Sequence, residues 1–138
     1  IKIYLDILGF KNISLLNSDD NKLTDFKCIS NTDSILVSCA QNSLYGKEAK
    51  DEDDWETTGR PEIQSFLARM YINDCKKGIF ITNSYFSDLA IEFVDNFNNK
   101  NQDVEIKLIN GYELTKSIRN HKYYILKEEL LNETKYNI

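Results

Sequence analysis

The feature that most constrains the fold is a strand–helix–strand pattern in the second half of the sequence. Gly78–Thr82 (GIFIT) is a short apolar run typical of a buried strand, and Val104–Asn110 (VEIKLIN) alternates apolar and polar residues. The segment NSYFSD between them supplies N-cap residues for a helix. The apolar positions of that helix recur at helical spacing, at Ala90, Phe93, Val94 and Phe97. This order predicts an α/β unit built on a central sheet.

Further strands precede this unit, and two of them are expected to form a hairpin. Leu23–Ser30 and Ser34–Ala40 have strand-like composition and are joined by the turn-forming residues NTD. Asn12–Leu16 is a shorter strand candidate, and a long polar loop follows the hairpin. A meander that leads into an α/β unit predicts a mixed sheet with helices on both faces, which is a three-layer core.

Four more helical segments are expected around this sheet. Pro61 suits the first position of a helix that runs to about Cys75, and a later helix begins at Gly111. The tail from Tyr123 to Leu131 is also expected to be helical. The helix after Pro61 has apolar positions at Ile63, Phe66, Leu67, Met70 and Tyr71. The first helix ends at Gly9, and its apolar positions are Ile1, Leu5 and Leu8.

Length and composition predict one folded domain. A chain of 138 residues is long enough to bury a core, so we expect residues 1–138 to form a single domain. Because only the end of the first helix is present, we also expect the chain to be a fragment of a longer protein. Its short apolar runs are not membrane spans. The cysteines Cys28, Cys39 and Cys75 form no CxxC pair and are expected to be reduced and buried, as in a cytoplasmic protein.

Several classes of active site lack their residues in this sequence. The one histidine, His121, is predicted at the end of a helix, where a histidine more often stabilises the helix terminus than catalyses. Nucleophilic pairs that need a histidine are therefore disfavoured. The cysteine spacing matches no zinc set, and the glycines form no phosphate-binding loop.

One carboxylate stands out in the hairpin. Asp25 lies within the otherwise apolar and basic strand LTDFKCIS. A buried carboxylate there is costly unless it is paired or bound to a metal. A solvent-facing Asp25 is the simpler alternative, and the strand pattern alone leaves both open.

Four blocks of sequence resemble the catalytic domain of Mrr-type restriction endonucleases, in the same order as in that family. Gly78–Glu92 resembles the family pattern GIF-ITT-x-F-S-x-A-x-E, and Leu108–Leu114 resembles LI-DG-x-EL. The helix start GRPEIQSF, from Gly59, is similar to G-x-PEIQ-x-F, and Leu8–Phe10 resembles L-G-[YF]. The resemblance covers nearly the whole chain and implies a restriction-endonuclease-like fold of the PD-(D/E)xK superfamily.

The resemblance also implies where a catalytic site would lie. The family's metal-binding Asp corresponds to Asp25, its Glu or Gln to Ser38, and its Lys to Ala40. In such a site Mg²⁺ or Mn²⁺ is held by carboxylate oxygens, with the carbonyl of Cys39 as a further ligand. The lysine activates water and offsets charge on the attacked phosphate of DNA. Residues 38 and 40 point to one side of a strand, so Ser38 remains a weak candidate ligand whereas Ala40 can perform neither task of the lysine.

Three interpretations of Ala40 stay open. The chain is a natural pseudonuclease, or the alanine was introduced into this sequence. In the third, a lysine elsewhere has taken over the role, and the candidates are Lys27, Lys47 and Lys50.

Two hypotheses about function therefore follow. The first is a metal-dependent DNA endonuclease domain of a larger restriction or defence protein, inactive as given because of Ala40. The second is a noncatalytic module that binds nucleic acid or protein. Under the first, Lys47, Lys50 and Arg60 are candidate phosphate contacts, and a second copy of the chain is a candidate partner. The acidic segment Gly46–Glu56, with Trp55, is more simply a solvated loop, and it dominates the net charge of −5.

Overall fold

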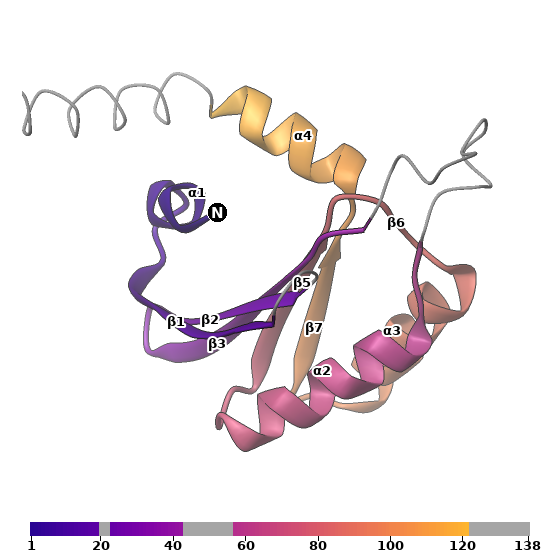
Figure 1. Cartoon of the computed structure of the whole chain (residues 1–138). Coiled ribbons are helices and arrows are strands. Elements are labelled where there is room, and N and C mark those ends of the chain that lie inside the picture. The colour runs from indigo at the N-terminus through magenta and orange to yellow at the C-terminus, as the bar shows by residue number, and fades with distance from the viewer. Residues whose placement is uncertain (20–22, 43–56, 122–138) are drawn as a thin grey trace, which may run out of the picture.

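The structure is a computed structural model, and it describes residues 1–19, 23–42 and 57–121 (Figure 1). Its helices and strands follow the order expected from the sequence, with two short strands added. They are α1 (Lys2–Ile7), β1 (Lys11–Asp19), β2 (Leu23–Ser30), β3 (Asp33–Ala40), β4 (Thr57–Thr58), α2 (Arg60–Ile72), β5 (Lys77–Thr82), β6 (Tyr85–Phe86), α3 (Asp88–Lys100), β7 (Glu105–Ile109) and α4 (Gly111–Asn120).

The main sheet is mixed, as the sequence predicts. Its strand order is β1-β2-β3-β5-β7, in which β1, β2 and β3 are antiparallel neighbours and β3, β5 and β7 run parallel. The register of the hairpin pairs Asp25 with Ser38 and Leu23 with Ala40. The short strands β4 and β6 form a separate parallel pair, which the sequence patterns do not reveal.

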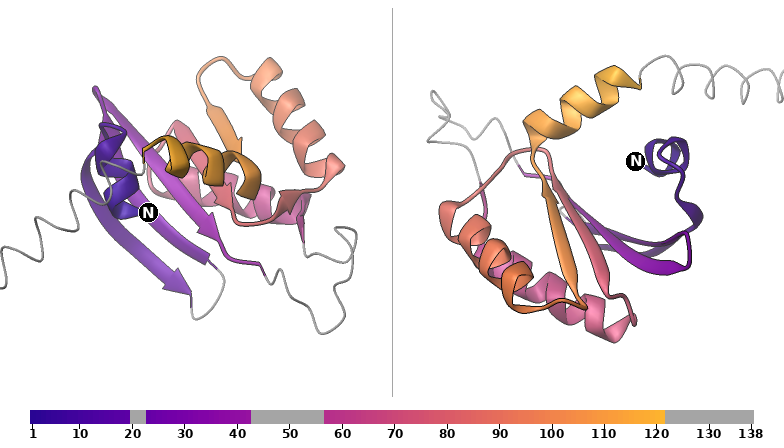
Figure 2. Two further views of the ribbon diagram at one scale, coloured as in Figure 1. Left: turned by 90° about the horizontal axis from the view of Figure 1, so that it is seen from above. Right: turned by 180° about the vertical axis from the view of Figure 1, so that it is seen from behind.

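Helices cover both faces of the sheet and complete the three-layer core (Figure 2). The α2 and α3 side holds the larger apolar cluster, in which Phe66 and Phe80 are fully buried and meet edge to face at 5.2 Å between ring centroids. The α1 and α4 side holds a smaller cluster around Leu5, Val37 and Ile81. No helix among the described residues has the length and apolar character needed to span a membrane.

Side chains alternate along β3, so successive residues of this strand point to opposite faces of the sheet. Leu36 packs in the α2 and α3 cluster, and Ala40 packs against it. Ile35 and Val37 belong to the opposite cluster. Positions 36, 38 and 40 therefore all point toward α2, so the face that carries Ser38 and Ala40 lies under this helix.

Helix α2 lies close to the sheet because Gly78 of β5 has no side chain. A Cβ atom at this position would lie 2.7 Å from the Phe66 ring and 2.5 Å from Met70 Sδ. Both distances are too short for real carbon contacts, so the packing distance between α2 and β5 depends on this glycine.

The outer edge of β7 is covered by a side chain from α3. Asn98 Nδ2 donates to the Ile106 carbonyl at 2.8 Å, and the Ile106 N–H donates to Asn98 Oδ1 at 3.0 Å. One amide side chain thereby satisfies both backbone groups of an edge residue.

Some details of the helices differ from the sequence-based prediction. Tyr71 is 86% exposed, not part of the buried stripe, because the buried positions Ile63, Phe66 and Met70 already fill the side of α2 that faces the sheet. The helix ends at Ile72, before Cys75, with Asn73 Nδ2 bonded to the Arg69 carbonyl at 2.8 Å. The expected helix in the tail from Tyr123 to Leu131 lies outside the described residues.

Candidate active-site face and the Arg69 ion pair

Asp25 and Ser38 lie side by side on the sheet face beneath α2. They are register partners on β2 and β3, and both are buried, with 4% and 0% of their surfaces exposed. Asp25 is therefore not the solvent-facing residue of the simpler alternative. The structure brings these two predicted site residues together on one face, as the alternation of β3 requires.

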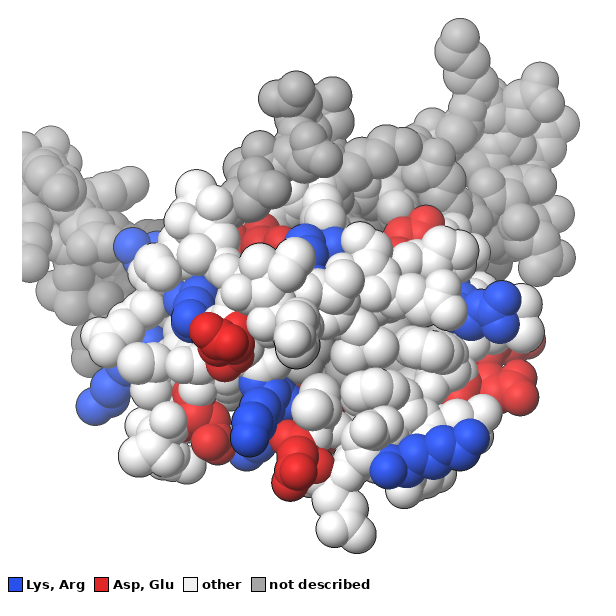
Figure 3. All heavy atoms as spheres, turned by 90° about the horizontal axis from the view of Figure 1, so that it is seen from below, with Lys and Arg blue, Asp and Glu red and all other residues white. Residues whose placement is uncertain are grey.

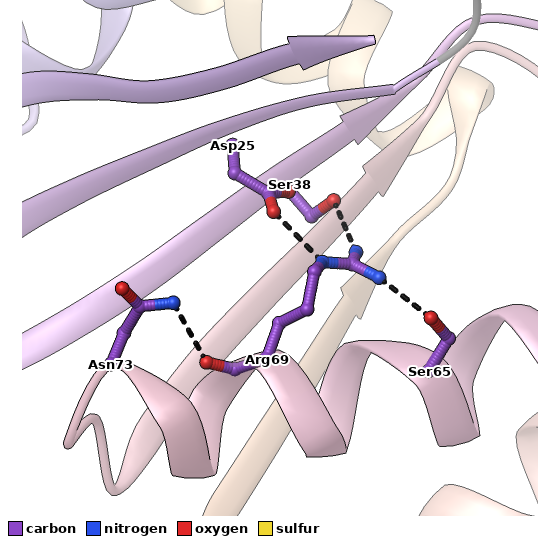
Figure 4. A network of polar contacts seen from close by, with 5 residues as sticks. All are labelled: Asp25, Ser38, Ser65, Arg69 and Asn73. Carbon is purple, nitrogen blue, oxygen red and sulfur yellow. Dashed lines mark hydrogen bonds and ion pairs between the residues drawn. The ribbon is translucent and has the colours of Figure 1, made fainter.

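The positive charge beside Asp25 comes from α2 (Figure 4). Arg69 Nε donates to Asp25 Oδ2 at 2.8 Å in an ion pair, and Arg69 Nη2 donates to Ser38 Oγ at 3.2 Å. A third nitrogen, Nη1, donates to Ser65 Oγ at 2.9 Å. The guanidinium carbon also lies 5.7 Å from the centroid of the Phe66 ring, within the range of a cation–π contact.

The second oxygen of Asp25 has no such partner. Oδ1 is buried and makes no hydrogen bond to any described residue. A buried acceptor without a partner is uncommon and marks a place for a donor such as a water molecule. The site therefore offers a single free oxygen on its one carboxylate.

Ala40 places a methyl group where the family pattern has a lysine. It is half-buried and packs against the α2 and α3 cluster. Its carbonyl accepts from the Asn83 N–H at 3.3 Å, and Asn83 Oδ1 accepts from the Asn42 N–H at 2.8 Å. Asn42 Nδ2 reaches the buried hydroxyls of Thr58 at 3.1 Å and Thr82 at 3.3 Å. These bonds fix the chain as it leaves β3.

Of the candidate replacements for the lysine, the structure describes Lys27, and its side chain is bonded elsewhere than to Asp25. Lys27 projects from the same face of β2, but its Nζ donates to the Asn73 carbonyl at 2.9 Å, beyond the end of α2. Arg60 is exposed at the start of α2. Lys47, Lys50 and Trp55 lie outside the described residues, so their predicted roles remain predictions.

Cys39 points away from Asp25, toward the α1 and α4 side. Its side chain packs against the cluster around Val37. Burial raises the pKa of the Cys39 thiol from 9.0 to about 11, and nearby charges act in opposite directions. Burial therefore favours the neutral thiol over the thiolate, which disfavours Cys39 as a nucleophile. The proposed role of the Cys39 carbonyl stays a prediction.

His121 has a structural environment at the C-terminal end of α4. Its Nδ1 lies 2.8 Å from the Ser117 carbonyl, and its ring meets the Tyr4 ring edge to face. Tyr4 Oη is also hydrogen-bonded to Ser117 Oγ, which joins α1 to α4. These contacts agree with the structural role expected for this histidine.

Arg69 is the site residue that the sequence analysis missed. It follows Phe66 by three positions, so it lies on the edge of the apolar stripe, where a long side chain can reach under the helix. The available signal was Asp25 itself, because a carboxylate in an apolar strand needs a partner if it is buried. The arginine on the facing edge of the next helix was the candidate to examine.

The architecture defines the class of protein. A mixed five-strand sheet flanked by helices, in a chain whose sequence also matches a restriction endonuclease family, is a restriction-endonuclease-like fold. A crystal structure described as a protein of unknown function, AF1548, shares it with a TM-score of 0.52 and 16% sequence identity. The match covers 78% of this chain and 52% of that one, so this chain spans about half of the solved protein.

The family follows from the sequence match. Residues 5–118 match the Mrr catalytic domain, described as a restriction endonuclease, and the chain belongs to this family. No curated protein matches the sequence. Restriction endonuclease domains act on DNA and generally use divalent metals.

The residues on the Asp25 face do not fit such a metal. Mg²⁺ keeps several water ligands but usually takes one or two carboxylates from the protein. Here one oxygen of Asp25 is free, while the other is bound to Arg69. Ser38 accepts from the same guanidinium, and Ala40 has no side-chain ligand atom. Across residues 1–19, 23–42 and 57–121, no three His, Cys, Asp or Glu side chains gather as a metal-binding group.

Proposed function

We propose that this chain is a restriction endonuclease domain of a defence system that engages DNA but does not hydrolyse it in the sequence as given. The observation that carries the proposal is the pairing of Asp25 with Arg69 on a face where residue 40 is alanine. Family membership supports DNA as the ligand, and the geometry supports a site that does not hydrolyse it.

Hydrolysis of a phosphodiester needs an activated water and a positive charge where negative charge develops on the phosphate. Ala40 supplies no charge, and the charge of Arg69 is already engaged by Asp25. Removing one group that stabilises the transition state typically costs roughly 3–4 kcal/mol, which is about two to three orders of magnitude in rate. Without the lysine of the family pattern at position 40, this face is not expected to hydrolyse DNA.

The surface formed by α2 and α3 is not the expected DNA side. Figure 3 shows basic and acidic side chains interspersed over it, with no continuous basic patch on its described residues. DNA binding depends on clustered Lys and Arg contacts to phosphates. We therefore place DNA at the edge where β2 and β3 meet the start of α2, near Arg60.

A supercoiled plasmid tests the catalytic half of the proposal. We expect the chain as given to leave the plasmid intact with Mg²⁺ or Mn²⁺. We expect Ala40→Lys combined with Ser38→Glu and Arg69→Met, which frees Asp25 for a metal, to nick it. Asp25→Asn in that background should abolish nicking. Agarose gels measure the outcome. Asp25-dependent nicking by the chain as given would contradict the proposal that this site does not hydrolyse DNA.

A gel shift in the presence of EDTA tests the DNA-binding half. We expect metal-independent retardation of duplex DNA that weakens as salt rises, since phosphate contacts release counterions. Arg60→Ala should reduce this retardation, whereas Lys107→Ala, an exposed change on β7, should not. Absence of any shift would exclude DNA as the ligand.

A protein-binding module is the second candidate, and a specific surface favours it. A mostly apolar cavity of about 420 Å³ opens between α2, α3 and the start of β7, next to the exposed Tyr71. Its lining includes Leu67, Met70, Phe97 and Val104. If DNA does not bind, this surface is the place to examine.

A further inference from the structure

Arg69 is bound on every nitrogen that can donate, by residues from three separate elements. Its partners are Asp25 on β2, Ser38 on β3 and Ser65 on its own helix. We propose that the Arg69 guanidinium is the permanent counter-charge of Asp25, replacing the divalent cation used by the family, so that this face binds no divalent metal. The inference rests on the proposed function, because it concerns the same site.

The burial of the two charges supports a permanent pair. The Asp25 side chain is 5% exposed and the Arg69 side chain 21% exposed. A buried carboxylate requires a positive partner, because water no longer stabilises its charge. In an intact nuclease that partner is the metal, and here the requirement is already met by the protein itself.

The shape of the arginine supports replacement of a metal. A guanidinium is planar, always charged and able to donate several hydrogen bonds in fixed directions. It binds Asp25 Oδ2 and Ser38 Oγ, which are the two side chains that a metal on this face would use. The cation–π contact with Phe66 and the bond to Ser65 hold the group in this position.

A divalent cation would have to displace this group. It would meet a like charge within hydrogen-bond distance of its only carboxylate ligand, and it would gain a single free oxygen, Asp25 Oδ1. Displacement would also leave the Arg69 charge without its buried partner. Both effects favour the arginine over a metal.

Thermal unfolding of the full chain with and without millimolar Mn²⁺ tests the metal part of the proposal. Acidic residues elsewhere can bind Mn²⁺, so the comparison is between the chain as given and Asp25→Asn. We expect Mn²⁺ to shift the Tm of both proteins equally. A larger Mn²⁺ shift in the chain as given than in Asp25→Asn would overturn the proposal.

A double-mutant cycle tests the pairing itself. We expect Arg69→Met to lower the Tm by about 10 °C, because it leaves a buried carboxylate unpaired. Adding Asp25→Asn should recover at least half of this loss, since the uncompensated charge is then removed. Arg60→Met is the matched control on the same helix, and its Tm should stay close to that of the chain as given.

Each outcome of the cycle has a clear meaning. If Arg69→Met fails to fold while the double variant folds, the coupling is confirmed in its extreme form. If the two substitutions act additively, Arg69 is not the counter-charge of Asp25 and the proposal is wrong. The DNA gel shift in EDTA involves neither metal nor this cycle, so failure of the proposed function is seen separately.

Discussion

At the scale of single residues, the neighbours of each buried Asp or Cys side chain determine whether a charge can be stabilised there. Asp25 is held beside Arg69, whereas the buried Cys28 thiol lies in the apolar cluster on the α1 and α4 side. Cys28 is 1% exposed, and burial, reinforced by Cys75, raises the pKa of its thiol from 9.0 to about 11. A neutral thiol of this kind acts as a small apolar side chain.

The raised pKa of the Cys28 thiol predicts how the free energy of unfolding changes in alkaline solution. Because the folded pKa is raised, the thiol ionises first in the unfolded chain, and stability falls as pH rises from 9.0 through about 11. The loss from this group should not exceed about 3 kcal/mol. Urea unfolding of the chain and of Cys28→Ala across this range measures it. An equally steep decline in Cys28→Ala would assign the effect to other groups.

At the scale of elements, the position of α2 determines the candidate site. The helix carries Arg69 toward β2 and β3, and the carbonyl of Asn73, which follows its last residue, accepts from Lys27 of β2. Its close approach to β5 depends on the bare backbone of Gly78. The site geometry therefore depends on the packing of α2 against β5 at Gly78, a residue outside the site itself.

Substituting Gly78→Ala should destabilise the domain by about 1–3 kcal/mol, because the added methyl group would clash with Phe66 and Met70. Chemical denaturation measures the change. Lys107→Ala on the neighbouring strand β7 is the control, since Lys107 is exposed and should have little effect. An unchanged midpoint in Gly78→Ala would show that α2 can move away from β5 at little cost.

At the scale of the whole molecule, the periodicity of apolar residues was enough to predict the mixed sheet and the helices that flank it. The strand Leu23–Ser30 was predicted with its observed bounds, because a hairpin has strong local signals. The register of that hairpin then places Asp25 beside Ser38. These features depend on residues that are close in sequence, so the sequence pattern predicts them.

The features that escaped the sequence analysis depend on tertiary contacts. The pair β4 and β6 is too short to produce a pattern, and Tyr71 matches helical spacing although it faces outward. The partner of Asp25 lies 44 positions away on α2, and only the packing of that helix on the sheet brings it near. Local propensity contains no information about such a contact.

The outer layer of α1 and α4 gives a prediction at this scale. Tyr4 is hydrogen-bonded to Ser117 and packs against the His121 ring, so the two ends of the described chain are linked. Tyr4→Phe should cost about 1 kcal/mol and speed amide exchange in α1 and α4, leaving α2 unaffected. Hydrogen exchange measured by mass spectrometry distinguishes the layers. Faster exchange throughout the domain would instead indicate global destabilisation.

The side chain of Asn98 has a consequence for how copies of this domain can meet. An edge strand with free backbone groups is a template for intermolecular sheet extension and aggregation. At Ile106 both groups are already bonded to Asn98, so an incoming strand would have to break two hydrogen bonds before forming its own. Asn98 thereby protects β7 at Ile106 against continuation of the sheet into a second molecule.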